Sequence, residues 1–221
     1  FGWVGQVARA SFSNLSFITK GTIQDTITSA AADCGFLAKL TPSIDSLLWA
    51  TYFYAPNHRA GLIGCNWPSV AVNSKNSIII AGIVNDTGLI PIINSSVTQQ
   101  GVDIGITIID SSGRHYLVST YYGGEGAEDV FDMYVEQDDE IVLTGWTTSK
   151  NLPGASTAPC NEPSSNAFVA SLDQFASPVS ARCVGGVGDE RFYAAGPASC
   201  GNINLYGATS SSDYPLTRLA Y

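Results

Sequence analysis

Charged residues are scarce in this chain of 221 residues, and basic residues are the scarcest of them. Only 13% of the sequence is charged, with 10 Lys or Arg against 19 Asp or Glu and a formal net charge of −9. A chain so poor in cations cannot neutralise many phosphate groups, so we expect no nucleic-acid binding. The same deficit argues against docking on anionic lipid. No apolar run approaches the roughly 20 residues needed to insert across a bilayer.

Patterns for metal binding and catalysis are lacking too. The cysteines form no C-x-x-C pair, and the two histidines, His58 and His115, stand far from any metal-ligand spacing, so we expect no zinc site and no cofactor. No G-x-S-x-G motif presents a serine nucleophile. Carboxylate pairs of the glycosidase kind come from separate loops, and the sequence leaves that alternative open. Nothing points to such a pair, and we predict that the protein is not an enzyme.

Acidic residues gather in one stretch, which suggests two interpretations. Carboxylates on adjacent loops can bind Ca²⁺. The stretch has no D-x-D-x-D-G ladder, however, and Asp138-Asp139 fits the tip of a hairpin, so we interpret it as a solvated loop face. Residues 110–114 (D-S-S-G-R) resemble the Asp-containing turn of sialidases but are more simply a type I turn with a left-handed glycine. The acidic residues are Glu125, Glu128, Asp129, Asp132, Glu136, Asp138, Asp139 and Glu140.

Glycine is abundant, with 22 residues, and short apolar runs alternate with Ser, Thr and Asn. This mixture predicts an all-β protein of many short strands joined by turns. The chain begins at Phe1 rather than Met, which we interpret as the result of signal-peptide removal. Sequons at Asn14, Asn85 and Asn94 are candidate glycosylation sites of an extracellular glycoprotein. We therefore expect a secreted protein at the cell surface or outside the cell.

The five cysteines suit an oxidising environment. Outside the cell they predict up to two disulfides with one thiol left over, and their spacing leaves the pairing open. Buried free thiols that act as small apolar side chains are the alternative. The candidates are Cys34, Cys65, Cys160, Cys183 and Cys200.

Internal repetition is the most informative feature of the sequence. Three strand-like runs end at a glycine that is followed a few residues later by proline. These glycines are Gly82, Gly145 and Gly207, and the two intervals between them are almost equal. The last two begin a G-x-T-x-S pattern. The spacing predicts repeated units of one length, each large enough to hold several strands.

A second element recurs with the same period. Residues 35–40 (G-F-L-A-K-L) match residues 167–172 (A-F-V-A-S-L), and residues 103–110 fill the corresponding place between them. Another strand-like run follows each copy. Two of these runs close on a glycine pair, at residues 123–124 and 185–186, and an acidic cluster comes next.

This succession resembles the β-propeller repeats of secreted bacterial and archaeal proteins. It consists of a tyrosine-rich strand, Gly-Gly, an acidic loop, an inner strand, G-x-T-x-S, a loop with proline, and A-F-V-A-x-L-D. The match is best over residues 121–153 with 167–173, and over 184–215. It is loose over residues 1–100, where residues 57–68 replace the Gly-Gly loop. The resemblance implies a scaffold of four-stranded blades and says little about activity.

In the resembling family each blade runs outward as inner strand, second strand, "A-F-V-A" strand and outer strand. The resemblance therefore implies two complete blades here and, near the C-terminus, the first two strands of another. One complete blade comprises residues 129–135, 140–145, 167–172 and 179–184. The other comprises residues 69–73, 77–84, 103–109 and 115–122. The C-terminal pair comprises residues 191–198 and 202–208.

The N-terminal residues do not divide evenly into repeats. Residues 1–8 and 15–20 look like the last two strands of a blade, with residues 2–7 in the "A-F-V-A" place. We expect them to complete the C-terminal strand pair, either within the chain or on a neighbouring copy. The blade that contains residues 35–40 and 47–54 is then left with only residues 22–31 in place of its two inner strands.

The fold expected from these features is a small all-β propeller of about four blades, one of them incomplete. It forms a single domain over residues 1–221, with a half-blade at 1–33 and repeats at about 34–100, 101–165 and 166–221. Strands donated to a neighbour make a head-to-tail contact, which produces a ring or an open filament.

We therefore predict a non-catalytic extracellular structural or adhesive subunit that assembles with copies of itself into a filament or surface layer. The candidate assembly residues are Phe1, Trp3, Val4, Val7, Leu15, Phe17, Leu205 and Tyr206. The alternative is a lectin-like propeller that binds surface glycans through aromatic side chains at strand ends and in loops, although packing between blades explains those aromatics more simply. They are Trp67, Trp146, Tyr121, Tyr122 and Tyr214.

Overall fold

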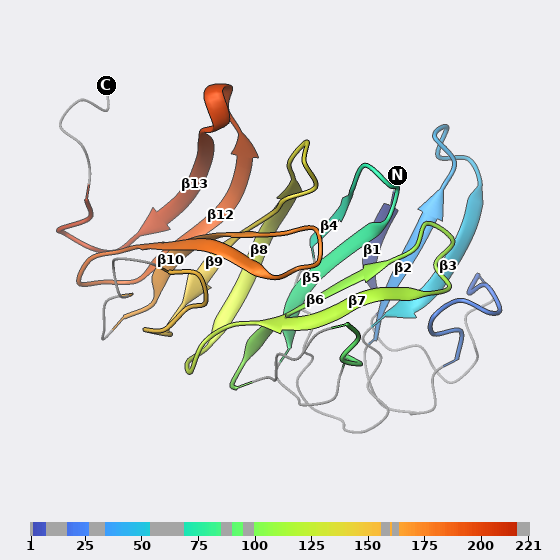
Figure 1. Ribbon diagram of the computed structural model, residues 1–221, viewed down its shortest axis with the longest axis horizontal. Coiled ribbons are helices and arrows are strands. Elements are labelled where there is room, and N and C mark those ends of the chain that lie inside the picture. Colours follow the sequence, from blue (N-terminus) through green and yellow to red (C-terminus); the bar gives the residue numbers. More distant parts are fainter. Residues whose placement is uncertain are drawn as a thin grey trace. The chain divides into compact units, whose positions relative to one another are not determined.

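The computed structural model of the chain is built from β-strands and turns (Figure 1). It describes residues 2–7, 17–26, 34–53, 69–84, 90–94, 100–155, 160 and 164–215. Across these ranges, no helix is long and apolar enough to cross a membrane. The elements are β1 (Gly2–Val7), β2 (Cys34–Leu40), β3 (Leu47–Phe53), β4 (Ser69–Val72), β5 (Ile78–Val84), β6 (Asp103–Ile109), β7 (Tyr116–Tyr122), β8 (Glu128–Val135), β9 (Ile141–Thr147), β10 (Asn166–Leu172), β11 (Pro178–Val184), β12 (Glu190–Pro197), the 3₁₀ turn η1 (Ser199–Gly201) and β13 (Ile203–Thr209).

The described strands form four separate sheets, which confirms the all-β class. Their strand orders are β1-β2-β3, β4-β5-β6-β7, β11-β10-β9-β8 and β12-β13. The two four-stranded sheets contain the strands expected for the two complete repeats, in the expected order. The last sheet contains the expected C-terminal pair and no further described strand.

By its contacts the chain divides into two compact units. The first comprises Phe1–Val97 and Gly105–Thr120, and the second comprises Thr98–Ile104 and Tyr121–Tyr221. The sheet β8–β11 and the pair β12–β13 both belong to the second unit.

The first sheet departs from the expectation for the N-terminus. β1 pairs antiparallel with β2 and places Gly5 opposite Phe36. In the third sheet the same glycine–phenylalanine pairing joins Gly145 of β9 to Phe168 of β10. β1 therefore takes the place of a second strand and not the "A-F-V-A" place. The expectation that residues 1–8 complete the last sheet within the chain is wrong for the described strands, because β1 belongs to the sheet β1-β2-β3 and the last sheet contains β12 and β13 alone among them.

The segment that was expected to supply further strands forms turns in its described part, residues 17–26. The backbone N–H of Thr19 donates to the carbonyl of Ala50 at 2.9 Å, and the N–H of Tyr52 donates to the carbonyl of Gln24 at 2.9 Å. These bonds cover part of the outer edge of β3, which would otherwise be an open sheet edge. Residues 15–16 and 27–31 lie outside the described ranges.

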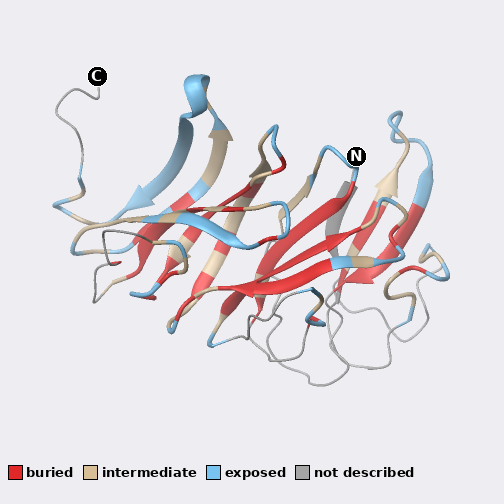
Figure 2. Ribbon diagram, viewed as in Figure 1, coloured by how far each residue is buried: buried red, intermediate tan, exposed pale blue. Residues whose placement is uncertain are grey.

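Burial follows the apolar runs of the sequence. β6 is buried at every position, and β5 and β9 at every position but one. Nearly continuous apolar strands are typical of sheets that are covered on both faces. β11 has no buried position, and β13 is exposed at every position (Figure 2).

Candidate functional site

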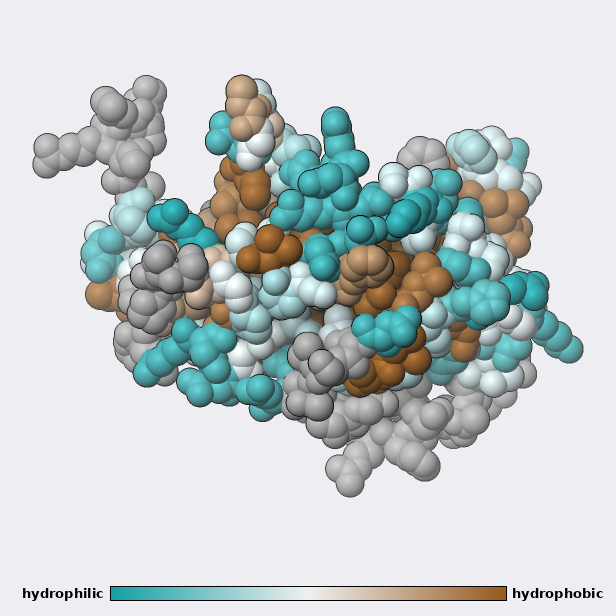
Figure 3. Space-filling model, in the orientation of Figure 1, coloured by the Kyte–Doolittle hydropathy of each residue, from teal (hydrophilic) through white to brown (hydrophobic). Residues whose placement is uncertain are grey.

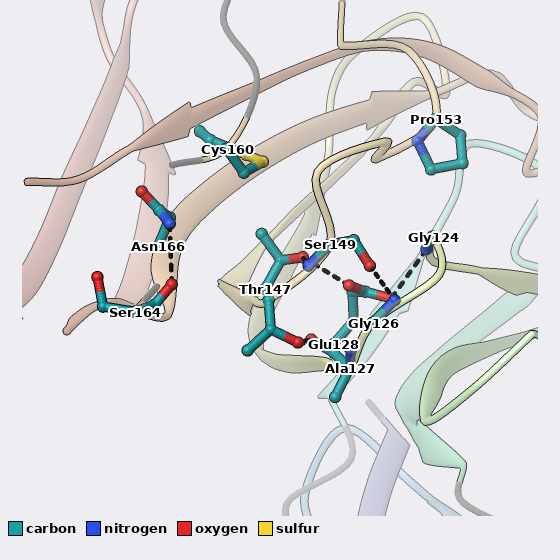
Figure 4. The surroundings of a disulfide bond; sticks show 12 residues. Gly124, Gly126, Ala127, Glu128, Thr147, Ser149, Pro153, Cys160, Ser164 and Asn166 are labelled. Carbon is teal, nitrogen blue, oxygen red and sulfur yellow. Dashed lines mark hydrogen bonds between the residues drawn. A yellow bond between two sulfur atoms is a disulfide. The ribbon is translucent and has the colours of Figure 1, made fainter. Parts of the chain in front are cut away.

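A hydrogen-bonded turn joins the Gly-Gly pair to the start of β8 (Figure 4). At its centre the fully buried carboxylate of Glu128 accepts a hydrogen bond from the backbone N–H of Gly124 at 2.9 Å. It accepts another from the hydroxyl of Thr147 at 2.5 Å. The hydroxyl of Ser149 also contacts this carboxyl group. Thr147 and Ser149 are the threonine and serine of the G-x-T-x-S pattern, so the pattern and the acidic cluster are two halves of one structure.

Side-chain oxygens also accept hydrogen bonds from other backbone N–H groups of this turn. The hydroxyl oxygen of Ser149 accepts from the N–H of Gly126 at 2.7 Å. The amide oxygen of Asn151 accepts from the N–H of Glu125 at 2.9 Å. An added Cβ at Gly126 would lie 2.8 Å from the backbone nitrogen of Ser149, so only glycine fits there.

The same turn recurs one repeat later, at the start of β12. Glu190 accepts from the N–H of Gly186 at 2.9 Å and from the hydroxyl of Thr209 at 2.7 Å. The hydroxyl of Ser211 donates to the same carboxylate. Asp213 takes the part of the asparagine in the first turn and accepts from the N–H of Val187 at 2.9 Å. The repeat therefore preserves a complete hydrogen-bond network as well as a strand pattern.

The two turns differ in one neighbour of the central glutamate. Asp103 and Glu128 meet beside the first Gly-Gly pair, and Asn166 and Glu190 meet beside the second. Burial raises the pKa of Asp103, although the N–H of Gln100 donates to its carboxylate at 2.8 Å. Burial likewise raises the pKa of Glu128, and the charge of Asp103 raises it further. Two carboxyl groups in one buried place favour retention of a proton, whereas an asparagine adds no charge.

The interpretation of the acidic stretch is thus partly wrong. Asp138 is exposed at the tip of the β8–β9 hairpin, as expected, with Asp139 at a positive φ of 68°. Glu128 is not solvated, because it is the buried acceptor of a turn, and Asp139 is buried as well. In the part of the chain that the structure describes, no group of three or more His, Cys, Asp or Glu residues could hold a metal ion.

Residues 110–114 form a hydrogen-bonded turn with a left-handed glycine, as expected. The N–H of Gly113, at a φ of 71°, donates to the carbonyl of Asp110 at 3.1 Å. The exposed ring of His115 lies 3.0 Å from the Asp110 carboxylate. Burial acts to raise the pKa of Asp110, but hydrogen bonds from His115 and Ser112 outweigh it and hold that pKa well below its usual range. His58 lies outside the described residues.

The aromatic residues considered for sugar binding serve mainly in packing. Tyr121 and Tyr122 are buried. Trp146 is half-buried beneath a guanidinium of β12 that lies 5.8 Å from its ring centroid. Tyr214 is half-buried, and Trp67 lies outside the described ranges. None of the described four is exposed.

One disulfide is present among the described cysteines. Cys160 and Cys183 are bonded, with 5.3 Å between their Cα atoms, within the usual range. Cys200 is free and exposed. Cys34 lies in β2, its side chain is not described, and Cys65 lies outside the described ranges. A disulfide fits an extracellular protein.

Loss of this disulfide is expected to destabilise the second unit. The bond closes a loop with a sequence separation of 23, so the double substitution of Cys160 and Cys183 by serine should lower the free energy of unfolding by about 3 kcal/mol. Urea unfolding followed by tryptophan fluorescence measures the change. A loss below about 1 kcal/mol would show that the crosslink does not constrain the unfolded chain as expected.

One of the three candidate glycosylation sites is described. Asn94 is exposed, and its side-chain nitrogen donates to the carbonyl of Leu117 at 2.7 Å. That nitrogen would carry a glycan, so modification would compete with this bond. Asn14 and Asn85 lie outside the described residues.

The strongest contrast between equivalent residues of the repeat is at β13. Ile141 and Leu143 of β9 are fully buried, whereas their equivalents Ile203 and Leu205 are 37% and 36% exposed. Tyr206 is 70% exposed. The cause is that β9 lies between β8 and β10, while among the described strands β13 pairs with β12 alone. Figure 3 shows the resulting apolar surface over the β12–β13 pair.

The candidate assembly residues are thus divided between the two ends of the described chain. Leu205 and Tyr206 lie on β13, within the strand predicted at residues 202–208. Phe17 packs edge-on against Phe36, with 5.5 Å between the ring centroids. Trp3, Val4 and Val7 lie in β1, while Phe1 and Leu15 lie outside the described ranges.

No protein-family model matches the chain, and a search of curated proteins finds no match. Within the chain, however, the two glutamate-centred turns resemble each other, and so do the strands that follow them.

Proposed function

We propose that the protein is a non-catalytic extracellular structural or adhesive subunit that joins copies of itself by head-to-tail β-strand contacts, in a filament or surface layer. Its four sheets would be blades of a small propeller-like scaffold, two of them complete. The observation that supports this proposal is the open strand β13, whose equivalent elsewhere in the chain is covered by another strand.

β13 lacks the usual protection of an edge strand. Natural edge strands carry charges, proline or bulges that discourage pairing. The sequence of β13, I-N-L-Y-G-A-T, has no charged residue and no proline, and the bulge of its sheet lies in β12, between Phe192 and Ala194. An unprotected apolar edge is suited to strand addition, in which main-chain hydrogen bonds supply the affinity.

A carbohydrate- or surface-binding module is the second candidate, supported by one feature. Tyr193 and Tyr206 are both exposed on the β12–β13 pair, with 6.4 Å between their ring centroids. Exposed tyrosines can stack on a ligand, but they lie on the same strands that offer the open edge. Tyrosine fluorescence that responds to a glycan in a protein that stays monomeric would favour this second function.

The self-assembly proposal is tested by a charge placed on the open strand. Leu205→Lys introduces a cation on the strand that would add a partner, so we expect self-association to weaken by at least about tenfold, or 1.4 kcal/mol. Sedimentation velocity over a range of concentrations measures this.

Val179→Lys is the matched control. Val179 is also an exposed apolar residue, 58% accessible, on an edge strand of the same unit, so this charge should leave self-association unchanged. A wild-type chain that stays monomeric at the highest concentration, or equal effects of the two substitutions, would contradict the proposal.

A further inference from the structure

β1 and β13 occupy the same place in the repeat. β1 sets Gly5 opposite Phe36 of β2, as β9 sets Gly145 opposite Phe168 of β10. Gly207 of β13 is the equivalent of Gly145, because each begins a G-x-T-x-S pattern. Both β1 and β13 are therefore second strands, and each belongs to a sheet that is short of strands.

The two short sheets are complementary. Among the described strands, the sheet β1-β2-β3 has no counterpart of the innermost strand β8, and the sheet β12-β13 has no counterpart of β10 and β11. β12 pairs with β13 as β8 pairs with β9, with a register shift at the equivalent residues. Placing β13 beside β2 would produce the order β12-β13-β2-β3, which matches the complete sheet β8-β9-β10-β11.

β1 is connected to its sheet differently from the other second strands. Residues 8–33 join β1 to β2, whereas residues 85–102 and 148–165 make the equivalent connections in the complete sheets. The latter two are equal in length and shorter. Loop-closure entropy disfavours the longer connection only slightly, and residues 17–26 are held at the edge of β3. What makes β1 replaceable is its place in the repeat, which an incoming second strand would fill in the same register.

The charges of the two units favour a head-to-tail contact. The first unit carries six Lys or Arg against five Asp or Glu, and the second carries four against fourteen. A contact that joins β13 to β13 would bring two strongly acidic units together. A contact from the second unit of one copy to the first unit of the next avoids this repulsion. It is also heterologous, as filament growth requires.

We propose that β13 of one copy replaces β1 of the next copy and pairs antiparallel with β2, with Gly207 opposite Phe36. This inference rests on the self-assembly proposed above and names the two strands that meet. The register follows from the β9–β10 pairing, in which Val142 faces Ser171. The equivalent intermolecular pair is Asn204 and Lys39.

Disulfide trapping tests the register between copies. In a Cys200→Ser background, one preparation carries Asn204→Cys and a second, with a size tag, carries Lys39→Cys. Directly opposite residues of an antiparallel pair have Cβ atoms roughly 4.5–5.5 Å apart, which is within reach of a disulfide. Mild oxidation of the mixture should yield the tagged–untagged dimer as the main new species, with the 204–39 link identified by peptide mass mapping.

A register control accompanies the trap. Leu205→Cys mixed with Lys39→Cys should crosslink at least about tenfold less, because a one-residue shift turns the side chain to the other face of the sheet. Equal crosslinking of both pairs, or a dominant 204–204 link, would overturn the inference. A chain that carries both Asn204→Cys and Lys39→Cys and forms the 204–39 link only within itself would also overturn the inference. If sedimentation shows association but no 204–39 link forms, the strand assignment fails while the proposed function stands. If no association occurs, the proposed function itself fails.

Discussion

Substitution of Glu128 by alanine is expected to lower the free energy of unfolding by about 3–5 kcal/mol, among the largest effects of any single change. The carboxylate is fully buried and accepts hydrogen bonds from the N–H of Gly124 and the hydroxyl of Thr147. Its removal leaves these donors without an acceptor in a site that water does not reach, and each unsatisfied group costs about 1–3 kcal/mol. Urea unfolding monitored by circular dichroism measures the loss.

Two further variants distinguish the loss of the hydrogen-bonded turn from the loss of a negative charge. Glu125→Ala removes a carboxylate from the same loop, but that residue is exposed, so its effect should stay within about 0.5 kcal/mol. Glu128→Gln keeps the shape and one acceptor oxygen and should fall between the two. If Glu128→Ala is no more harmful than Glu125→Ala, the hydrogen-bonded turn does not stabilise this unit.

The middle of the chain was predictable because its signals are redundant. The recurring G-x-T-x-S glycines and Gly-Gly pairs mark the strands of the sheet β8–β11 and of the pair β12–β13, and apolar runs agree with them at β9 and β10. Each signal has a separate physical cause, such as close backbone approach at the glycines and burial on both faces for the apolar runs. Agreement among independent constraints identifies the strands to within a few residues.

The N-terminal strand was not predictable in the same way. The sequence of β1, G-W-V-G-Q-V, is short, apolar and contains glycine, so it is compatible with a second strand or a third one. Only the strand with which β1 pairs distinguishes a second strand from a third. The pairing of Gly5 with Phe36 of β2 identifies β1 as a second strand. Strand identity in a sheet depends on pairing between residues far apart in sequence, which a local pattern does not contain.

The central role of Glu128 was also hidden in the sequence. It lies among several other acidic residues, most of which are in contact with solvent, and nothing in the neighbouring sequence distinguishes the buried carboxylates of Glu128 and Asp139 from the others. Its hydroxyl partner Thr147 lies 19 residues further on. The available signal was the repetition itself, since Glu128, Thr147 and Ser149 recur together as Glu190, Thr209 and Ser211.

Substitution of Asp103 by asparagine is expected to stabilise the protein at pH 7 by about 1–2 kcal/mol. Burial raises the pKa of Asp103 and of Glu128 from their ordinary values. The folded chain therefore binds more protons than the unfolded chain once the pH passes about 4. Wild-type stability must fall as the pH rises from there through the raised folded pKa values, and the loss persists at neutral pH. Asparagine removes one of the two carboxyl groups and, with it, much of this loss.

The second turn supplies the reciprocal experiment, because Asn166 already stands beside Glu190. Asn166→Asp would place a second carboxyl group in an equally buried position, since Asn166 is 1% exposed. We expect it to destabilise by about 1–2 kcal/mol at pH 7 and by clearly less near pH 4, where the added group can keep its proton. Urea unfolding of both variants between pH 4 and pH 8 should show opposite changes that converge toward acid. If Asp103→Asn lowers stability equally at every pH, Asp103 acts as a charged acceptor for the N–H of Gln100, and the paired carboxyl groups impose no proton-linked cost on the fold.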